Sequence, residues 1–443
     1  MPPTPLENNV ARTKALLGAG ARLSDYLSAS LLARVVPAED VHAVLNAHGC
    51  NSQRTRSFPA VAGVYYCMAL SLYPEAAYEE VFCAVAQGLA WAAGAPQPVR
   101  VAKSSISELR SKIGAQPLAD LVERCCLPLA EPATHPQAFY QGLRVVAMDG
   151  SNFELPDEPD NVAHFGYPGS RTGHAGYPQA QCAVLVECAT HAILAAHIDS
   201  YRASEWSVCE PLLARMDHTM LCLADRGFNG FEYWRKAQAT GAQLLWRCAN
   251  NRQLPVLQAL PDGSYLSQIH PPKRSASQRE RTDADVEPDT STQATSPTAP
   301  APPTATPITV RVIEYAMPGL PEGEGRYRLM TSLLDPATAP ALELAALYHE
   351  RWQVEAVFDE LKTHLLQGRR VLRSKKAQLV RQEFYGWVLA HYSVRWLLHQ
   401  GAARQQIPHA RQSFSAHLQL LRQTLPQSGA FPPTAADKAQ ALV

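Results

Sequence analysis

The sequence lacks the features that mark secreted, zinc-binding and membrane-spanning proteins. Its 10 cysteines include no CxxC pair, and several lie in apolar stretches, where a free thiol acts as a small hydrophobic side chain. The opening MPPTPLENNV does not resemble a signal peptide, and no apolar run reaches the length of about 18 residues that a membrane span requires. We therefore expect a reduced, cytoplasmic protein without membrane contact.

The sequence also lacks a net charge, because 40 Lys and Arg residues balance 40 Asp and Glu residues. Nucleic-acid-binding proteins of this size are often basic, so the balance counts mildly against that class, although local clusters can still bind phosphates. The chain has 443 residues, of which 46% are hydrophobic. That length and composition suffice for two or three domains with a sizeable core.

Two patterns of hydrophobic residues divide the chain. Residues 1–130 show helical spacing with Gly and Pro breaks, and they predict an all-helical N-terminal domain. From about residue 140, short strand-like runs such as LRVVAMD and TMLCLADRGF take over. Their order of three strands, a helix, a strand, a helix and a strand predicts an α/β core.

A stretch with few large hydrophobic residues interrupts the second region. Residues 270–307 are rich in Pro, Thr, Ser and Ala, and they predict a disordered loop. Strand-like runs flank this loop, so residues 250–335 predict a β-rich insertion. Residues 382–400 predict a further amphipathic helix, and residues 401–443 predict a C-terminal tail.

The segment YHERWQVEAVFDELK contains no Pro or Gly and predicts a helix. At about 100° per residue, Tyr348, Arg351, Glu355 and Lys362 share one strip beside the buried face. One interpretation is a surface helix with ordinary ion pairs. In the other, Glu355 is a metal ligand, and further acids are needed elsewhere. The remaining glutamates point away from the strip and are interpreted as surface charges: Glu350 and Glu360.

Two aspartates end strand-like runs: Asp149 ends RVVAMD, and Asp225 ends LCLAD. A carboxylate at the tip of a buried strand needs a cleft or a bound cation, and α/β folds place ligands at such tips. Each aspartate has another interpretation, since Asp149 and Gly150 could form a turn and Asp225 could cap a helix. Together with Glu355, the two would form an oxygen-rich site suited to Mg²⁺ or Mn²⁺.

Three carboxylates suit phosphoryl transfer with two metal ions. Two ions about 3.5–4 Å apart can clamp the attacking and leaving oxygens of an in-line displacement. The reaction then needs little beyond positioning and charge stabilisation. Arg351 and Lys362 could hold phosphates, and Tyr348 could hydrogen-bond or stack near a sugar or base.

A local excess of positive charge follows this segment. The run THLLQGRRVLRSKKAQLVRQ contains no acid between Thr363 and Gln382, so it could neutralise DNA phosphates. The alternative is a solvated basic face. The predicted DNA-binding residues are Arg369, Arg370, Arg373, Lys375, Lys376 and Arg381.

Several of these motifs together resemble one known family. The spacing Tyr348-x2-Arg351-x3-Glu355-x6-Lys362 resembles the Y-R-E-K motif of bacterial insertion-sequence DDE transposases of the IS-four family. The tracts VVAMDGSNFELPD and LADRGFNGFEYW resemble the two aspartate blocks of that family. The tract LSASLLARVVPAEDVHAVL resembles the helical N-terminal transposase domain that often precedes the catalytic domain.

The resemblance implies a ribonuclease-H-like catalytic core over residues 140–400, interrupted by the β-rich insertion. It makes Asp149, Asp225 and Glu355 the catalytic triad and the ligands of two Mg²⁺ (or Mn²⁺) ions per active site. The accessory positions that handle phosphate and DNA fall to Tyr348, Arg351 and Lys362, together with Arg226 next to the second aspartate. The N-terminal domain is expected to bind DNA ends.

The implied activity is metal-dependent cleavage and strand transfer at the ends of an insertion sequence. The implied partners are double-stranded DNA, as terminal inverted repeats and target, and a second copy of the chain in a synaptic homodimer near the bacterial nucleoid. Two alternatives stay open: a catalytically silent DNA-binding relative, and a metal-dependent nuclease of the same fold. Some relatives flip a base against a tryptophan, for which Trp246 is the nearest candidate, although its apolar strand favours a core position.

Overall fold

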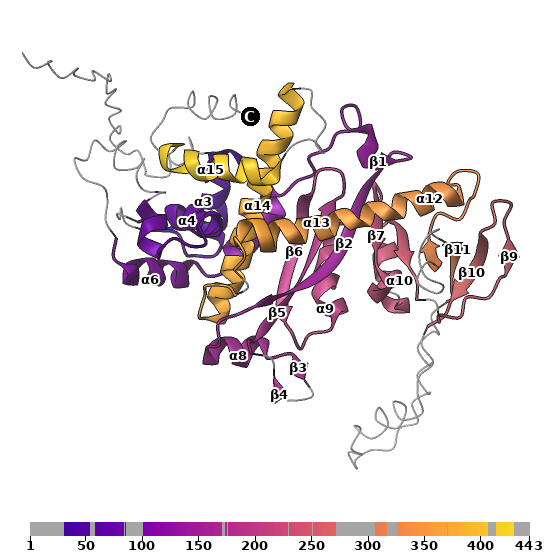
Figure 1. Ribbon diagram of the computed structural model, residues 1–443, viewed down its shortest axis with the longest axis horizontal. Coiled ribbons are helices and arrows are strands. Elements are labelled where there is room, and N and C mark those ends of the chain that lie inside the picture. The colour runs from indigo at the N-terminus through magenta and orange to yellow at the C-terminus, as the bar shows by residue number, and fades with distance from the viewer. Residues whose placement is uncertain are drawn as a thin grey trace, which may run out of the picture. The chain divides into compact units, whose positions relative to one another are not determined.

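The computed structural model divides the chain into two compact units, Met1–Arg215 with Arg351–Val443, and Met216–Glu350 (Figure 1). The residues that the structure describes are 31–53, 58–83, 85, 101–170, 173–174, 176–228, 230–249, 251–271, 306–316, 326–369, 371–405 and 413–428. The predicted loop at 270–307 and the end of the predicted tail therefore lie almost entirely outside the described residues.

The N-terminal part of the first unit is helical, which confirms the prediction for its described residues. Helix α4 is buried along its whole length because it packs against α3, α6 and the long helix α14. Its approach to α14 requires a glycine, since a Cβ atom at Gly386 would lie 2.7 Å from the backbone oxygen of Cys67. The helices are α2 (Leu31–Val35), α3 (Ala38–Ala47), α4 (Ala60–Leu72), α6 (Lys103–Ile113), α7 (Gln116–Cys125) and α14 (Ala377–Gln405).

Helix α14 is longer than predicted and is not amphipathic. Residues 382–395 are buried on every side of the helix. The reason is that α4 and α7 cover one part of its surface while strand β6 (Ala192–Ser200) covers another. A helix that is enclosed in this way has no solvent face to carry a polar stripe.

The sheet of the first unit is antiparallel, in the order β6, β5, β2. Strand β2 is continuous, and Asp149 near its middle pairs with Val184 of β5. A short helix and a small hairpin lie between β2 and β5 in the chain. The further elements are β1 (Phe139–Tyr140), β2 (Leu143–Glu154), α8 (Pro159–Phe165), β3 (Gly169–Ser170), β4 (Gly173–His174), β5 (Gln179–Glu187), α9 (Glu205–Cys209) and η2 (Glu210–Arg215).

Helices cover both faces of this sheet, as the alternation of side chains along β2 shows. Asp149 and Ser151 contact side chains of the segment that follows residue 350, so that segment covers one face. Gly150 faces the other way, because a Cβ atom there would lie 3.6 Å from the carboxylate of Glu205 in α9. Phe153 shares the face of Asp149 and packs against Trp387 of α14. Asp149 therefore faces helices that come from much later in the sequence, namely the segment after residue 350 and α14.

The second unit contains a mixed sheet in the order β7, β8, β12, β11, β10, β9. Strands β7 and β8 are parallel and joined through α10, whereas the remaining neighbours are antiparallel. Trp246 of β8 is fully buried against Tyr233 and Trp234 of α10, a core position. The bounds are β7 (Met220–Ala224), η3 (Arg226–Phe228), α10 (Phe231–Ala239), β8 (Gln243–Arg247), β9 (Gln258–Ala259), β10 (Tyr265–Ile269), β11 (Ile308–Ala316) and β12 (Arg326–Thr331).

The segment predicted as one helix is helical but changes its winding. It runs through α12 (Ala341–Tyr348), the 3₁₀ turn η4 (His349–Arg351), α13 (Trp352–Asp359) and the π-helical turn η5 (Glu360–Leu365). A uniform 100° step therefore misplaces side chains beyond residue 359. The predicted tail includes a further helix, α15 (Phe414–Ser428), which packs against α14 and η5.

A helical N-terminal region followed by a mixed α/β core with a β-rich segment is the architecture that the sequence predicted. In the part of the chain that the structure describes, no helix has the length and apolar character needed to cross a bilayer.

Candidate active site

Asp149 lies within a continuous strand and not at a strand end, so that part of the prediction is wrong. Strand β2 continues through Gly150 as far as Glu154, where it still pairs with Gln179 of β5. The backbone amide of Gly150 donates to Asp149 Oδ1 at 2.8 Å. The strand pairing of Asp149 and Gly150 with β5 also excludes a turn at these two residues. The carboxylate projects from the sheet face that α13 covers.

Arg351 joins two of the three predicted catalytic acids. Its Nη1 donates to Asp149 Oδ2 at 3.1 Å, and its Nη2 donates to Glu355 Oε1 at 2.9 Å. The side chain of Arg351 is 8% exposed, compared with 19% for Asp149 and 43% for Glu355. A planar guanidinium presents its donors in a fixed fork, so it holds both carboxylates in one geometry and offsets their mutual repulsion.

Lys362 lies on the same face of β2 as this pair. Its ammonium donates to Ser151 Oγ at 2.5 Å and lies 5.2 Å from the ring centroid of Phe153. Burial lowers the pKa of Lys362 below its ordinary value, because desolvation disfavours the charged form. The structure thus brings Asp149, Arg351, Glu355 and Lys362 together in the first unit. It does so although the π-helical turn η5 departs from the uniform 100° step on which the prediction of a shared strip was based.

Asp225 belongs to the second unit, where it directly follows β7 as predicted. Its Oδ1 is buried and makes no hydrogen bond, and the side chain as a whole is 34% exposed. The guanidinium of Arg247 lies 3.9 Å from this oxygen, beyond hydrogen-bonding distance. A carboxylate oxygen that is buried without a donor is poorly satisfied, so Asp225 would gain from an added cation.

Tyr348 supports the strand that carries Asp225. It is 3% exposed, and its hydroxyl donates to the carbonyl oxygen of Ala224 at 3.3 Å. Its role here is therefore to fix the residue before Asp225 from inside the second unit. Arg226, the next residue after the aspartate, is exposed in η3.

The three acids offer hard oxygen donors of the kind that Mg²⁺ and Mn²⁺ prefer. Asp225 Oδ1, which has no hydrogen-bond donor, could bind such an ion. Asp149 and Glu355 already share one cation, the guanidinium of Arg351, and their oxygens suit a metal ion as well. Among the described residues, however, no three His, Cys, Asp or Glu side chains gather as a metal-binding cluster. The structure brings Asp149 and Glu355 together, while Asp225 is part of the other unit.

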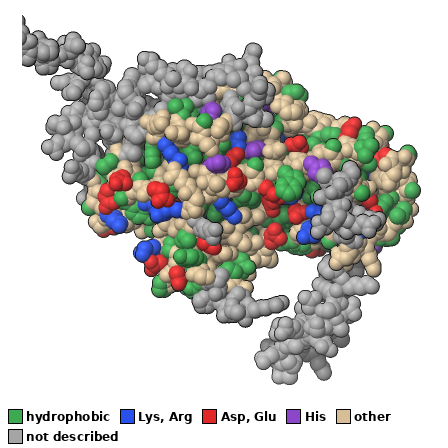
Figure 2. All heavy atoms as spheres, in the orientation of Figure 1, with side chains coloured by type: hydrophobic (Ala, Val, Ile, Leu, Met, Phe, Trp, Pro, Cys, Tyr) green, Lys and Arg blue, Asp and Glu red, His purple; other side chains and the backbone are tan. Residues whose placement is uncertain are grey.

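The predicted basic DNA-binding run divides into internally bound and exposed side chains. Arg373 donates to the carbonyl oxygens of Tyr73 and Ala76, and Arg381 pairs with Asp199 at 3.0 Å. The rest of the run, apart from Arg370, which lies outside the described residues, remains at the surface: Arg369 paired with Glu75, Lys375 paired with Glu158, and Lys376. On the face drawn in Figure 2, basic and acidic side chains are interspersed.

Two features of the site escaped the sequence analysis. Arg247 of β8 lies beside Asp225, which follows the neighbouring strand β7, and the apolar run before Arg247 does not indicate this contact. Glu360 was interpreted as a surface charge, and that is wrong. It is 6% exposed and pairs with Arg395 and His391 of α14. Its partners lie 31 and 35 positions further along the chain, on a helix whose position no periodic pattern within the segment could indicate.

Two protein-family models match the chain. The transposase DDE domain matches residues 140–392, which include all three candidate acids and the helical segment with Arg351. The N-terminal domain of insertion element 4 transposases matches residues 27–123, where the described residues are helical. These two matches follow the division into a helical region and an α/β core.

Individual relatives have related names. The chain is 26% identical over 302 residues to the transposase InsG for insertion sequence element IS4 of Escherichia coli strain K12, covering 67% of this chain and 61% of that protein. It is 24% identical over 147 residues to the putative transposase InsZ of the same organism, covering 33% of this chain and 49% of that protein.

Among solved structures, a piggyBac transposase synaptic complex with hairpin DNA aligns with this chain at a TM-score of 0.37 and 9% identity. The alignment covers 67% of this chain and 56% of the piggyBac chain. The family match has a firmer basis, since the DDE domain model covers more than half of the sequence. The helical N-terminal match and the similarity to InsG agree with it. The chain therefore belongs to the DDE transposase family.

Proposed function

We propose that this chain catalyses metal-dependent cleavage and strand transfer at the ends of an insertion sequence. The observation that carries the proposal is the double ion pair of Arg351 with Asp149 and Glu355. Asp149 lies 202 positions before Arg351 in the sequence, and Glu355 lies 4 positions after it. Folding stability alone does not explain why these two acids lie together inside a DDE transposase domain, because a mostly buried ion pair adds little to the free energy of unfolding.

Asp149, Asp225 and Glu355 would hold two divalent metal ions, Mg²⁺ or Mn²⁺. When bound, such ions stabilise the charge that develops on the phosphate oxygens during an in-line displacement. Arg351 keeps two of the acids at a fixed separation, and Tyr348 fixes the backbone next to the third. Lys362 places a positive charge near Asp149, where it can meet a DNA phosphate.

Double-stranded DNA is the proposed partner, both as terminal inverted repeats and as target. Lys375 and Lys376 are exposed after the active-site segment and can contact phosphates, as can Arg369 and Arg226 at the surface. The helical N-terminal domain, residues 1–130, is proposed to bind the DNA ends, and two copies of the chain to act together on two ends. The catalytic domain would extend over residues 140–400 and contain the insertion at 250–335.

The test is cleavage of a labelled duplex that carries the inverted repeats flanking the coding region. Wild-type protein with Mg²⁺ should cut at the repeat ends. Asp149→Asn, Asp225→Asn and Glu355→Gln should each reduce the single-turnover rate by about 10³-fold or more, since each removes an anionic ligand. Binding of the same duplex, measured by fluorescence anisotropy in EDTA, should change little.

Asp359→Asn serves as the matched control, because this exposed acid lies on α13 and pairs only loosely with His364 at 3.6 Å. It should cleave at the wild-type rate. Cleavage at a normal rate by Glu355→Gln would exclude the assigned site. Cleavage without joining of the cut end to target DNA would indicate a nuclease, and binding without cleavage would indicate a catalytically silent DNA-binding protein.

A further inference from the structure

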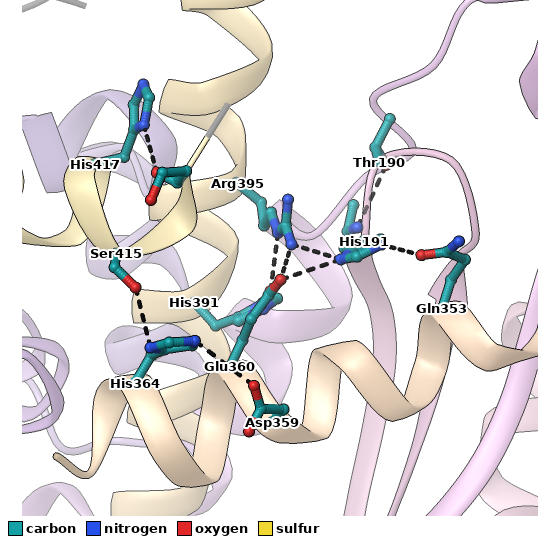
Figure 3. A network of polar contacts seen from close by, with 12 residues as sticks. Thr190, His191, Gln353, Asp359, Glu360, His364, His391, Arg395, Ser415 and His417 are labelled. Carbon is teal, nitrogen blue, oxygen red and sulfur yellow. Dashed lines mark hydrogen bonds and ion pairs between the residues drawn. The ribbon is translucent and has the colours of Figure 1, made fainter. Parts of the chain in front are cut away.

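Glu360 is a buried carboxylate that directly follows α13 in the chain (Figure 3). Helix α13 carries Glu355 and is called the active-site helix below. Glu360 is the first residue of the π-helical turn η5, five positions after Glu355. Arg395 donates to both of its carboxylate oxygens, through Nε to Oε2 at 2.9 Å and through Nη2 to Oε1. His391 Nε2 lies 2.7 Å from Oε2. A buried charge needs such complete pairing, because removing one partner leaves the other charge unsatisfied.

Arg395 is the cation that balances Glu360. His391 is fully buried, and desolvation lowers its pKa to about 3, so the imidazole is neutral and donates through Nε2. Phe414 of α15 covers the group, with its ring centroid 5.3 Å from that of His391 and 5.2 Å from the guanidinium carbon of Arg395. The group is therefore shielded from water by a helix in the predicted tail.

His191 connects this ion pair to α13. It lies in the turn between β5 and β6, and its Nδ1 is within hydrogen-bonding distance of Arg395 Nη2 and, at 3.1 Å, of Glu360 Oε1. Its Nε2 hydrogen-bonds to Gln353 Oε1 at 2.7 Å, so one imidazole joins Glu360 to Gln353. His191 has a φ of 59°, a left-handed conformation that costs a non-glycine residue about 1–2 kcal/mol. The imidazole is kept in the turn in spite of this strain.

These contacts fix the active-site helix at two points. Gln353 precedes Glu355 by two residues, and Glu360 follows it by five, so His191 and Arg395 hold α13 on both sides of the acid. The second point also fixes the first residue of η5, the turn that carries Lys362 to Ser151. A displacement of about 1 Å in a catalytic group can reduce a rate by about 100-fold.

We propose that Glu360, Arg395 and His191 are positioning residues, which set the place of Glu355 and Lys362 relative to Asp149 from behind the active-site helix. Their hydrogen bonds described above join them to one another, to His391 and to Gln353, so we infer that they act through the backbone of α13 and η5. Their use in catalysis rests on the proposed function, whereas their control of the helix position is a property of the fold alone.

The experiment compares two variants of the full-length protein. Arg395→Met removes the balancing cation. His191→Gly removes the bridge to Gln353 but suits the left-handed backbone, so it should retain most of the folding stability. We expect both to raise amide hydrogen exchange across residues 352–365 by at least about tenfold. We also expect cleavage of the flanking repeats to fall by about 30- to 100-fold, with affinity for the repeats changed less than about threefold.

Arg311→Met is the matched control. Arg311 is a fully buried arginine of the second unit that pairs with Asp262 and also donates to Ser264 and to the carbonyl oxygen of Ala339. It should lower the denaturant midpoint without raising exchange in residues 352–365 or slowing cleavage more than about threefold. Arg395→Lys, which restores the charge but not the forked contact, should recover part of the cleavage rate.

Unchanged exchange in residues 352–365 relative to Arg311→Met would overturn the inference. Raised exchange with cleavage at the wild-type rate would overturn it equally, because the contacts would then be structural only. If the wild-type protein fails to cleave its own repeats, the proposed function fails, and the exchange measurement still decides whether these residues hold the helix.

Discussion

The two units satisfy their candidate catalytic acids in opposite ways. In the first unit, Asp149 and Glu355 both accept hydrogen bonds from Arg351. In the second unit, Asp225 has a buried oxygen without any hydrogen bond, and the guanidinium of Arg247 lies 3.9 Å from that oxygen. The first pair is organised before any ligand arrives, whereas the single acid keeps one buried oxygen without a hydrogen-bond donor.

The difference indicates what each unit contributes to a metal site. A carboxylate pair held by a guanidinium keeps its geometry without a metal ion, and its rigidity reduces the reorganisation needed in catalysis. An unsatisfied carboxylate destabilises the free protein slightly and binds an added cation more favourably. Stability and activity should therefore respond differently to changes in the two units.

The largest expected effect comes from breaking the organised pair. Arg351→Lys keeps a positive charge but replaces the fork with a single ammonium, which cannot hold both carboxylates in the same plane. We expect the single-turnover cleavage rate to fall by about 100-fold. Arg247→Lys in the second unit is the matched change, and its longer contact predicts a loss below about fivefold. Equal losses of cleavage rate from Arg351→Lys and Arg247→Lys would contradict the difference between the two units.

A smaller effect is expected on folding stability in the absence of metal. Asp149→Asn should lower the free energy of unfolding by about 1–2 kcal/mol, because it removes a mostly buried partner of Arg351. Asp225→Asn should leave it unchanged or raise it by about 0.5 kcal/mol, because the buried Oδ1 accepts no hydrogen bond and the ion pair with Arg247 is long. Urea unfolding in EDTA measures both values. A comparable loss from Asp225→Asn would show that its charge is satisfied after all.

The smallest effect concerns Lys362 and pH. Burial lowers its pKa, so the folded protein binds this proton less tightly than the unfolded chain does. The desolvation penalty is complete at neutral pH and is relieved as the pH rises through the folded pKa toward the ordinary lysine value of about 10.4. The stability of wild type relative to Lys362→Met should therefore rise as the pH is raised from neutral toward that ordinary value.

Lys375 provides the control for this measurement. Its hydrogen bond to Glu158 raises its pKa, so its stabilising contribution is present below the ordinary lysine pKa and is lost above it. The stability of wild type relative to Lys375→Met should fall at high pH, the opposite sign to Lys362. The same sign for both lysines would mean that Lys362 is not desolvated.

Much of the fold could be predicted from local patterns. Apolar runs in their order identified the strands that become β2, β5, β6, β7 and β8, because buried strands are short and hydrophobic. The end of β7 at Asp225 was also predicted. The continuation of β2 past Asp149 was not, because the polar residues from Gly150 to Asn152 look like a turn until β5 pairs with them.

The site was predictable where motif spacing indicated it and unpredictable where packing rearranged it. The spacing of Arg351, Glu355 and Lys362 identified candidates that the structure gathers near Asp149. Their roles at the contact level were not predictable, since helical phase fails at the 3₁₀ and π turns on either side of α13.

The sequence by itself determined the family, the helical and α/β regions and the three candidate acids, because these depend on composition, local periodicity and motif spacing. Only the tertiary structure decided that Arg351 serves two acids, that Asp225 keeps an unsatisfied oxygen, and that Glu360 is buried behind the active-site helix. The physical reason is that burial and ion pairing depend on partners far away in the chain, such as Arg395, which lies 35 positions beyond Glu360.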